Sequence, residues 1–165
     1  MGDRRRQALR VQFDGKIKVG FHRAKITSDA GLLAFRELDQ VFRLTERGST
    51  VLAGPRHGKN TQHTMLAMLR QAIYGRLAGY EDVNDAERLR VDLPMRQVVG
   101  GRAKEKEAAS TSEMSRFETE MLSSRENLTA LMNLSGTWID SVYECAPLDK
   151  LILDLDGSVS PTHGD

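Results

Sequence analysis

The sequence predicts a mainly α-helical protein that leads into a single β-strand near its C-terminal end. Over most of the chain, apolar residues recur three and four positions apart, which is the period of an amphipathic helix. Ser, Thr and Asn, the residues that favour helix N-caps, precede several of these segments. Near the end the period changes to two, because Leu151, Leu153 and Leu155 alternate with Ile152 and two aspartates. These observations predict a helical bundle followed by one core strand.

The size and composition of the chain are those of a globular protein. Its 165 residues, 39% hydrophobic and 28% charged, can form one core of ordinary size. No apolar run approaches the length of a membrane span, and the Arg-rich start lacks the apolar stretch of a signal peptide. Cys145 is the only cysteine, which fits a reducing compartment. We therefore expect a cytoplasmic protein.

The first 19 residues predict a basic arm and a hairpin. Residues 1–10 contain four arginines and are expected to form a flexible arm. The short segments 11–13 and 17–19 flank Asp14-Gly15, which is a two-residue turn signal. A short antiparallel hairpin should therefore follow the arm.

Two helices are predicted in the next segment of the chain. Thr27 or Ser28 can cap the first, which should run to about residue 44, and Asn60 or Thr61 can cap the second. Residues 48–59 are expected to be a loop between them. The apolar sides consist of residues at helical spacing, namely Leu32, Leu33, Phe35, Leu38, Val41 and Phe42, then Met65, Met68, Leu69, Ala72, Ile73 and Leu77.

An acidic segment and a polar segment follow the second helix. The stretch from Gly79 to Glu87 contains four acidic residues and one Asn, but their spacing does not match a calcium-binding loop. We expect a capped, hydrogen-bonded turn that opens a short helix over residues 82–90. Pro94 should start a further turn or two of helix. Residues 100–109 are polar and rich in Gly and Lys, and they are the predicted linker.

Two capping boxes predict the last two helices. Ser110 with Glu113 and Ser123 with Glu126 both have the required spacing, and Pro147 should end the second helix. This last helix has the clearest apolar stripe in the chain, formed by Leu128, Leu131, Ser135, Trp138, Ile139 and Val142.

The charges of the chain are distributed unevenly. Residues 1–76 contain 15 Lys and Arg against 6 Asp and Glu, whereas residues 77–165 contain 9 against 17. A basic front half indicates a polyanionic partner, double-stranded DNA above all, although solvated helix faces would have the same composition. The densest cluster is Arg4-Arg5-Arg6. These three arginines are candidate DNA-binding residues.

A second basic candidate lies in the predicted loop before residue 60. Gly54-Pro55-Arg56-His57-Gly58-Lys59 has three residues between its glycines and is followed by Asn60, so it does not match a nucleotide-binding phosphate loop. A basic loop before a helix can still hold a DNA phosphate through side chains and backbone amides. We therefore expect Arg56 and Lys59 to contact DNA.

The terminal strand carries the candidate catalytic residues. Asp154 and Asp156 lie on one face of the predicted strand, where ionised carboxylates need a metal, a base or hydrogen bonds. The motif resembles the first motif of haloacid-dehalogenase-type phosphatases, in which Asp154 would be the nucleophile and Asp156 the acid/base. That motif needs downstream partners, and only nine residues follow Asp156. Solvated turn aspartates are a further alternative.

From about Val19 onward, a series of motifs occurs in order. The motifs are Thr27-Ser28-Asp29-Ala30-Gly31-Leu32-Leu33, Gly58-Lys59-Asn60 with His63, Gly79-Tyr80-Glu81-Asp82-Val83-Asn84-Asp85 with Leu89-Arg90, Arg116-Phe117-Glu118-Thr119-Glu120, and Leu153-Asp154-Leu155-Asp156-Gly157-Ser158 with Thr162-His163-Gly164. This series resembles the group 1 type of insertion-sequence DDE transposases of bacterial mobile elements. The resemblance covers nearly nine-tenths of the chain.

The resemblance implies a domain organisation. Residues 11–145 would form a helical DNA-binding region, with the linker near residues 100–109, and residues 146–165 would begin an RNase H-like α/β catalytic domain. We expect that domain to be incomplete, because the second Asp and the Glu of the catalytic triad are not found after Asp156. The resemblance also implies a bacterial cytoplasmic protein that associates with the nucleoid through DNA.

The chemistry implied is two-metal phosphoryl transfer that cuts and joins DNA. Asp156 would be the first Mg²⁺ ligand and a catalytic residue, with Asp154 as the alternative. The implied partner is the transposon end, bound by the protein alone or as a homo-oligomer on DNA. A non-catalytic DNA-binding remnant that inhibits an intact transposase is the alternative function, and we expect no strand cleavage by residues 1–165 alone.

Overall fold

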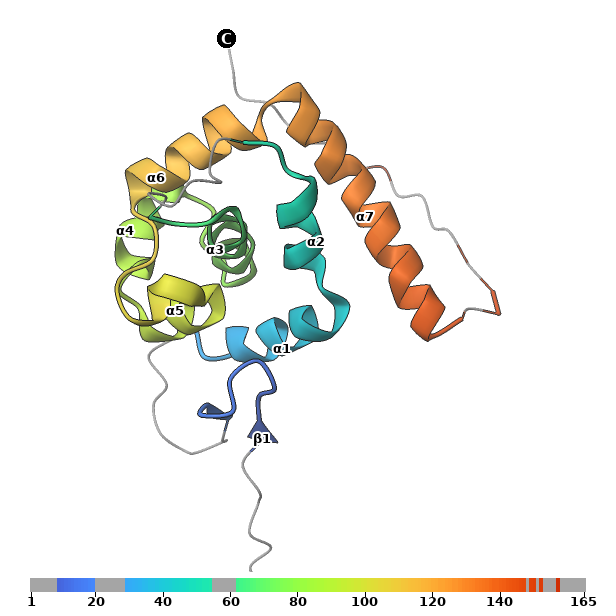
Figure 1. Cartoon of the computed structure of the whole chain (residues 1–165), viewed down its shortest axis with the longest axis horizontal. Helices are drawn as coiled ribbons and strands as arrows, with labels where there is room; N and C mark the ends of the chain where they lie inside the picture. Colours follow the sequence, from blue (N-terminus) through green and yellow to red (C-terminus); the bar gives the residue numbers. More distant parts are fainter. Residues whose placement is uncertain are drawn as a thin grey trace, which may run out of the picture.

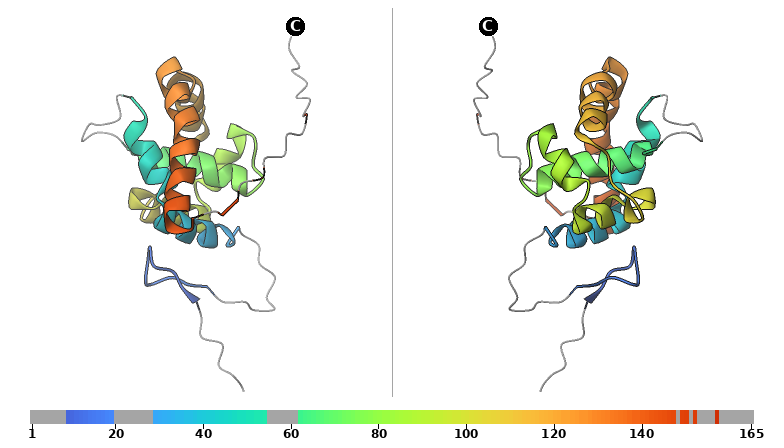
Figure 2. Two further views of the ribbon diagram at one scale, coloured as in Figure 1. Left: turned by 90° about the vertical axis from the view of Figure 1, so that its right-hand side faces the viewer. Right: turned by 90° about the vertical axis from the view of Figure 1, so that its left-hand side faces the viewer.

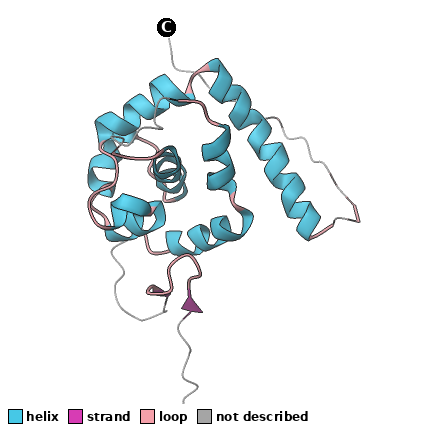
Figure 3. Cartoon of the chain, in the orientation of Figure 1, coloured by secondary structure: helices cyan, strands magenta, loops and turns pink. Residues whose placement is uncertain are grey.

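The computed structural model describes residues 9–19, 29–54, 62–147, 149–150, 152 and 157, and the architecture of these residues is mainly α-helical (Figures 1 and 3). The predicted mainly α-helical fold class is therefore confirmed. The α-helices are α1 Leu32–Phe42, α2 Leu44–Val51, α3 Met65–Leu77, α4 Ala86–Leu89, α5 Leu93–Val99, α6 Thr111–Arg116 and α7 Arg125–Cys145. Shorter helical segments are the 3₁₀ turns η1 Val83–Asp85 and η2 Gly101–Lys104, and the π-helix η3 Phe117–Leu122. Across the described residues, no helix is both long and apolar enough to cross a membrane.

Helix α3 occupies the middle of the structure, and the other helices surround it (Figure 1). Its most extensive contacts are with α5 and α2, while α7 lies outside α2. Buried side chains of α3 contribute to two core clusters. One contains Met68, Leu69 and Phe117, and the other contains Tyr74 with residues of α5. Because α3 is covered on most sides, it has no distinct polar face, and its amphipathic pattern is weak.

The predicted hairpin is present, with its strands shifted outward. Strand β1, Leu9–Arg10, pairs antiparallel with β2, Lys18–Val19. Residues 11–13 are not a strand, because the Glu37 carboxylate of α1 accepts hydrogen bonds from the backbone amides of Gln12, at 2.8 and 2.9 Å, and Phe13, at 3.4 Å. These amides bond to a helix instead of a partner strand, and the hairpin lies against the end of the helical body (Figure 2).

The first predicted helix is divided into two. Arg43 adopts a left-handed conformation, with φ of 58°, between α1 and α2. The Asp39 carboxylate accepts a 2.8 Å hydrogen bond from the backbone amide of Thr45, which satisfies a free donor at the start of α2. The expected loop from residue 48 is therefore wrong over residues 48–51, which complete α2.

The later helices begin at capping residues, although two of these caps differ from the predicted ones. Thr64 caps α3 by accepting a hydrogen bond from Ala67, so Asn60 or Thr61 was the wrong choice of cap. The capping box at Ser110 is confirmed, because Glu113 accepts a 2.9 Å hydrogen bond from the Ser110 amide. Helix α7 is capped by Ser124 rather than by the predicted Ser123.

The segment predicted as a linker, residues 100–109, packs into the helical core. Its Ala103, Ala108 and Ala109 are buried. The side-chain amide of Gln71, on α3, accepts a hydrogen bond from the Ala109 amide at 2.8 Å and donates one to the Ala109 carbonyl at 2.7 Å. The Gln71 side chain thus satisfies both backbone groups of Ala109, as a neighbouring strand would, and holds the segment against α3.

Helix α7 buries only some of its predicted apolar stripe. Leu131 and Trp138 of the stripe are partly buried. The buried residues of the helix, Leu134 and Asn127, lie outside the stripe, and the Asn127 side chain bonds to backbone groups of Ala53 and Met121. Leu128 and Ile139, which the stripe placed inside, are 50% and 42% exposed. The buried face of α7 is thus rotated from the predicted stripe toward Asn127 and Leu134.

The predicted terminal strand, residues 150–156, lies mostly outside the described residues. Lys150 and Ile152 are its described members, and neither is in a strand. The prediction for the rest of this segment therefore stays a prediction.

The structure predicts opposite effects for two methionine substitutions of the same kind. Met68 is fully buried in the core cluster that contains Phe117, whereas Met132 is 78% exposed on α7. Met68→Ala should lower the free energy of unfolding by about 2–5 kcal/mol, because it leaves a cavity in the core. Met132→Ala should change it by less than about 0.5 kcal/mol. Urea denaturation of both variants measures the difference, and equal effects would contradict the packing described above.

Candidate functional site

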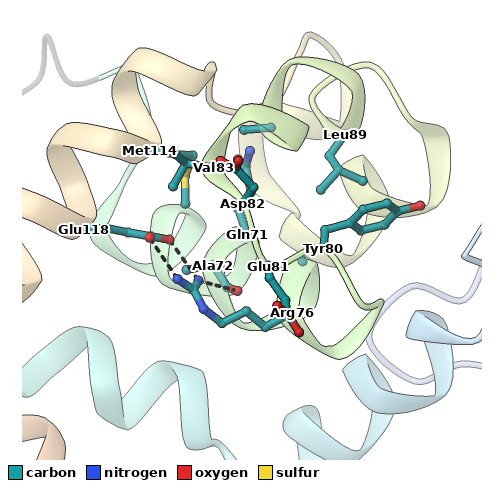
Figure 4. Close-up of a pocket in the computed structure, with 12 residues that line it drawn as sticks. Gln71, Ala72, Arg76, Tyr80, Glu81, Asp82, Val83, Leu89, Met114 and Glu118 are labelled. Carbon is teal, nitrogen blue, oxygen red and sulfur yellow. Dashed lines mark hydrogen bonds and ion pairs between the residues drawn. The ribbon is translucent and has the colours of Figure 1, made fainter. Parts of the chain in front are cut away.

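Motif segments that lie far apart in the sequence meet beside α3 (Figure 4). The Arg76 guanidinium, on α3, donates two hydrogen bonds to the Glu118 carboxylate of η3, at 2.9 and 2.8 Å. Such two-point pairs are geometrically specific. The bonds to Glu118 raise the pKa of Arg76. This ion pair joins the motif that contains Phe117 and Glu118 to the central helix.

The acidic motif after α3 forms the predicted capped turn. Asp82 accepts hydrogen bonds from the Asn84 backbone amide at 2.8 Å and from the Asn84 side-chain amide at 3.0 Å. The backbone bond, and secondarily the side-chain bond, holds the pKa of Asp82 below its ordinary range. The two residues therefore stabilise the start of η1.

Tyr80 connects the same turn to the residues before α1. Its hydroxyl donates a 2.9 Å hydrogen bond to Asp29, which belongs to the first of the motifs. The Arg88 guanidinium lies 4.8 Å from the centre of the Tyr80 ring and also donates to its hydroxyl. The bond to Asp29 is the main cause that raises the pKa of Tyr80. Through Tyr80, the first and third motifs are held together.

The hollow between these residues is small. Its volume is about 30 Å³, and Arg76, Tyr80, Asp82 and Glu118 are among the residues that line it. A space of this size holds about one water molecule. The motif residues seen in Figure 4 therefore hold the segments around α3 together.

A second polar cluster is buried on the other side of α3. The Asp39 carboxylate accepts hydrogen bonds from the hydroxyls of Thr45 and of Tyr74, the latter at 3.1 Å. Arg70 donates from Nε to the Thr45 hydroxyl at 3.1 Å and lies 3.7 Å from the same carboxylate. Arg36 lies 3.6 Å from it and stacks over the Phe13 ring of the hairpin. One carboxylate thus faces two guanidinium groups inside the fold.

The environment of this buried cluster shifts the pKa of its members. Burial lowers the pKa of Arg70, and the neighbouring Arg36 lowers it further, while Asp39 opposes both. Burial raises the pKa of Tyr74 far above its ordinary value, and the Asp39 charge adds to this effect. Tyr74 therefore remains protonated and can donate to Asp39 across the range of pH in which proteins work.

The structure also changes the interpretation of the basic front half of the chain. Arg36 and Arg70 are 7% and 6% exposed, so neither can contact DNA on the surface. Arg76 is engaged by Glu118, and Arg43 is paired with Glu46 at 2.8 Å. Some of the excess positive charge therefore stabilises the fold.

The predicted site residues fall outside the described residues of the chain. They are the candidate DNA contacts Arg4, Arg5, Arg6, Arg56 and Lys59 and the candidate metal ligands Asp154 and Asp156. Within the described residues, no three His, Cys, Asp or Glu side chains lie close enough together to hold a metal ion. The described residues therefore supply no alternative metal site.

The residues that sequence reasoning missed are Arg36 and Asp39. They follow the buried Leu32 by four and seven positions, so they lie on the inward side of α1. Charged residues at these positions of an apolar helix face are the signal that indicates a buried ion pair, because an unpaired charge would be too costly there.

The chain is similar to one known protein family over nearly its whole length. The model of the family described as Transposase DDE domain group 1 matches residues 9–165. No curated protein and no solved structure gives a match.

The first prediction from this geometry concerns Asp39. Asp39→Asn should lower the free energy of unfolding by about 3–5 kcal/mol, because it leaves two buried guanidinium groups without a counter-charge. The matched control is Glu46→Gln, which removes a carboxylate from the more exposed Arg43 pair and should cost less than about 1 kcal/mol. Denaturant unfolding at pH 7 tests both variants. A small effect of Asp39→Asn would show that Arg36 and Arg70 do not depend on this carboxylate.

A second prediction concerns pH. The folded-state pKa of Asp82 lies below the ordinary value of 3.8, so its stabilisation is present above that value and is lost as the pH falls through the lowered pKa. Asp82→Ala should therefore reduce the melting temperature at pH 7 and have less effect near pH 2. Glu81→Ala, at the exposed neighbouring position, should change the melting temperature little at either pH. Thermal unfolding monitored by circular dichroism measures these shifts.

Proposed function

The chain belongs to the group 1 family of DDE transposase domains, and from this membership we propose that it acts in the transposition of a mobile element by binding the element's DNA ends. The single observation that carries the proposal is the family match over residues 9–165. The charge and chemistry of individual residues support the proposed DNA contacts and catalytic residue.

The proposed DNA contacts are Arg4, Arg5 and Arg6 in the N-terminal arm, and Arg56 and Lys59 before α3. Binding by these residues is supported by the charge of the chain and by the helix that follows the second group. The first turn of α3 contains no acidic residue that would offset the positive end of the helix dipole. DNA phosphates are attracted to such helix ends, and basic side chains strengthen the attraction.

The proposed catalytic residue is Asp156, with Asp154 as the alternative. Each is an oxygen donor of the type that Mg²⁺ prefers. A bound Mg²⁺ pair would supply the activation of water or a 3′-hydroxyl and the stabilisation of the leaving oxygen. The helical region would hold the DNA, and the residues after α7 would contribute the carboxylates.

A charge-reversal experiment tests the DNA contacts. Arg56→Glu/Lys59→Glu should weaken binding to an element-end duplex. If two phosphate contacts are lost, the slope of log affinity against log salt should decrease by about 1.8. The affinity of the wild-type protein should fall steeply between low and high salt. Fluorescence anisotropy over a salt series measures both quantities.

The matched control reverses two charges in the acidic half of the chain. Arg125→Glu/Lys150→Glu changes exposed residues by the same amount of charge. This variant should bind DNA with a nearly unchanged salt slope. An affinity that does not change with salt, or equal losses in the two variants, would contradict the proposed contacts.

A further inference from the structure

An apolar groove lies open at the surface between α1, α3 and α7. Its volume is about 310 Å³. Phe35, Leu38 and Leu77, which line it, are 46%, 54% and 50% exposed. Other apolar residues that line it include Phe42, Ile73 and Trp138. We refer to these six residues as the α1–α3–α7 groove.

The walls of the groove are held in place. The Trp138 indole donates a 3.2 Å hydrogen bond to the Phe42 carbonyl oxygen, and the two rings meet edge to face with centroids 6.2 Å apart. The buried Tyr74 also lines the groove, and its hydroxyl is fixed by the hydrogen bond to Asp39. The groove is therefore a preformed surface.

Contiguous exposed apolar side chains usually mark a surface that another apolar segment covers. Single exposed leucines are common and need no explanation, but here three large exposed residues share one groove with three further aromatic rings. Removing this surface from water would be favourable in proportion to the area covered.

We propose that the apolar face of residues 151–155 packs into this groove. In an extended segment Leu151, Leu153 and Leu155 share one face, while Ile152 and Asp154 point the other way. The leucine face matches the groove in chemistry. Ile152 is 77% exposed and does not line the groove.

The connection to α7 is short enough to keep this segment near the groove and long enough to reach it. Helix α7 ends at Cys145, and its C-cap Ala146 leaves the helical conformation, with φ of −141° and ψ of 84°. Eight residues of helix separate Trp138 from Ala146, or about 12 Å. The five residues from Ala146 to Leu151 span at most about 18 Å when extended, so the chain can fold back to Trp138.

This packing places Asp154 and Asp156 on the face that points away from the helices. A helical layer that covers one face of a strand is the usual way to bury its apolar side. The packing itself does not depend on DNA binding or catalysis. If Asp156 is the metal ligand proposed above, the groove would also orient it.

Trp138 is the only tryptophan in the chain and lines the groove, so its fluorescence shows whether another segment shields the groove from water. Leu153→Ser should shift Trp138 emission to longer wavelength and increase its acrylamide quenching constant roughly twofold, because water reaches the groove. Ile152→Ser, the adjacent substitution on the other face, should leave both unchanged. Circular dichroism melts of both variants check that the helical region stays folded.

A cross-linking measurement tests the same contact by a second readout. In a Cys145→Ser background, Leu38→Cys with Leu153→Cys should form an intramolecular disulfide faster than Leu38→Cys with Ile152→Cys. Equal rates, or Trp138 quenching that is the same in the Leu153→Ser and Ile152→Ser variants, would overturn the proposal. A dimer in sedimentation, with quenching that depends on protein concentration, would assign the groove to a second copy of the chain and would equally overturn it.

Discussion

The arrangement of the helices depends on one buried carboxylate. Asp39 receives hydrogen bonds from Thr45 at the start of α2 and from Tyr74 in α3, and it lies beside Arg70 of α3 and Arg36 of its own helix. A carboxylate is costly inside a protein unless charges and hydrogen bonds compensate it. The same contacts that compensate Asp39 therefore specify how α1, α2 and α3 meet. They also explain the left-handed turn at Arg43, which brings Thr45 back within reach of the carboxylate.

Asp39 fixes one side of α3, and the opposite side of α3 contacts the motifs that resemble those of the family. Arg76 binds Glu118, and the turn that follows α3 carries Tyr80 to Asp29. These contacts leave space for about one water molecule between them, so Arg76, Tyr80 and Glu118 act as a framework. The residues proposed to bind DNA and metal belong to segments that flank this framework. In this proposal, structural support and chemistry fall on separate residues.

The charges of the front half show why composition alone overstates a binding surface. Arg36 and Arg70 count toward the basic excess, but both are buried with Asp39. Arg76 and Arg43 are paired with carboxylates. Arginine suits these buried and two-point pairs because its planar group has several donors. The remaining basic residues of the arm and of the loop before α3 then carry the proposed attraction to DNA.

The sequence by itself determined the elements whose signals lie within a few residues. The helix with Pro94 in its first turn, the capping box at Ser110 and the end of α7 before Pro147 follow from local backbone and side-chain chemistry. The candidate metal and DNA residues likewise rest on short motifs and local charge. Only the tertiary structure decided that Glu37 binds the hairpin amides, that Gln71 holds Ala109, and which face of α7 is buried. In these cases the partners lie far apart in the sequence, 25 residues for Gln12 with Glu37 and 38 for Gln71 with Ala109. The periodicity of a helix or strand carries no information about contacts with residues so far away in the sequence. Which side chains are buried depends on those long-range contacts.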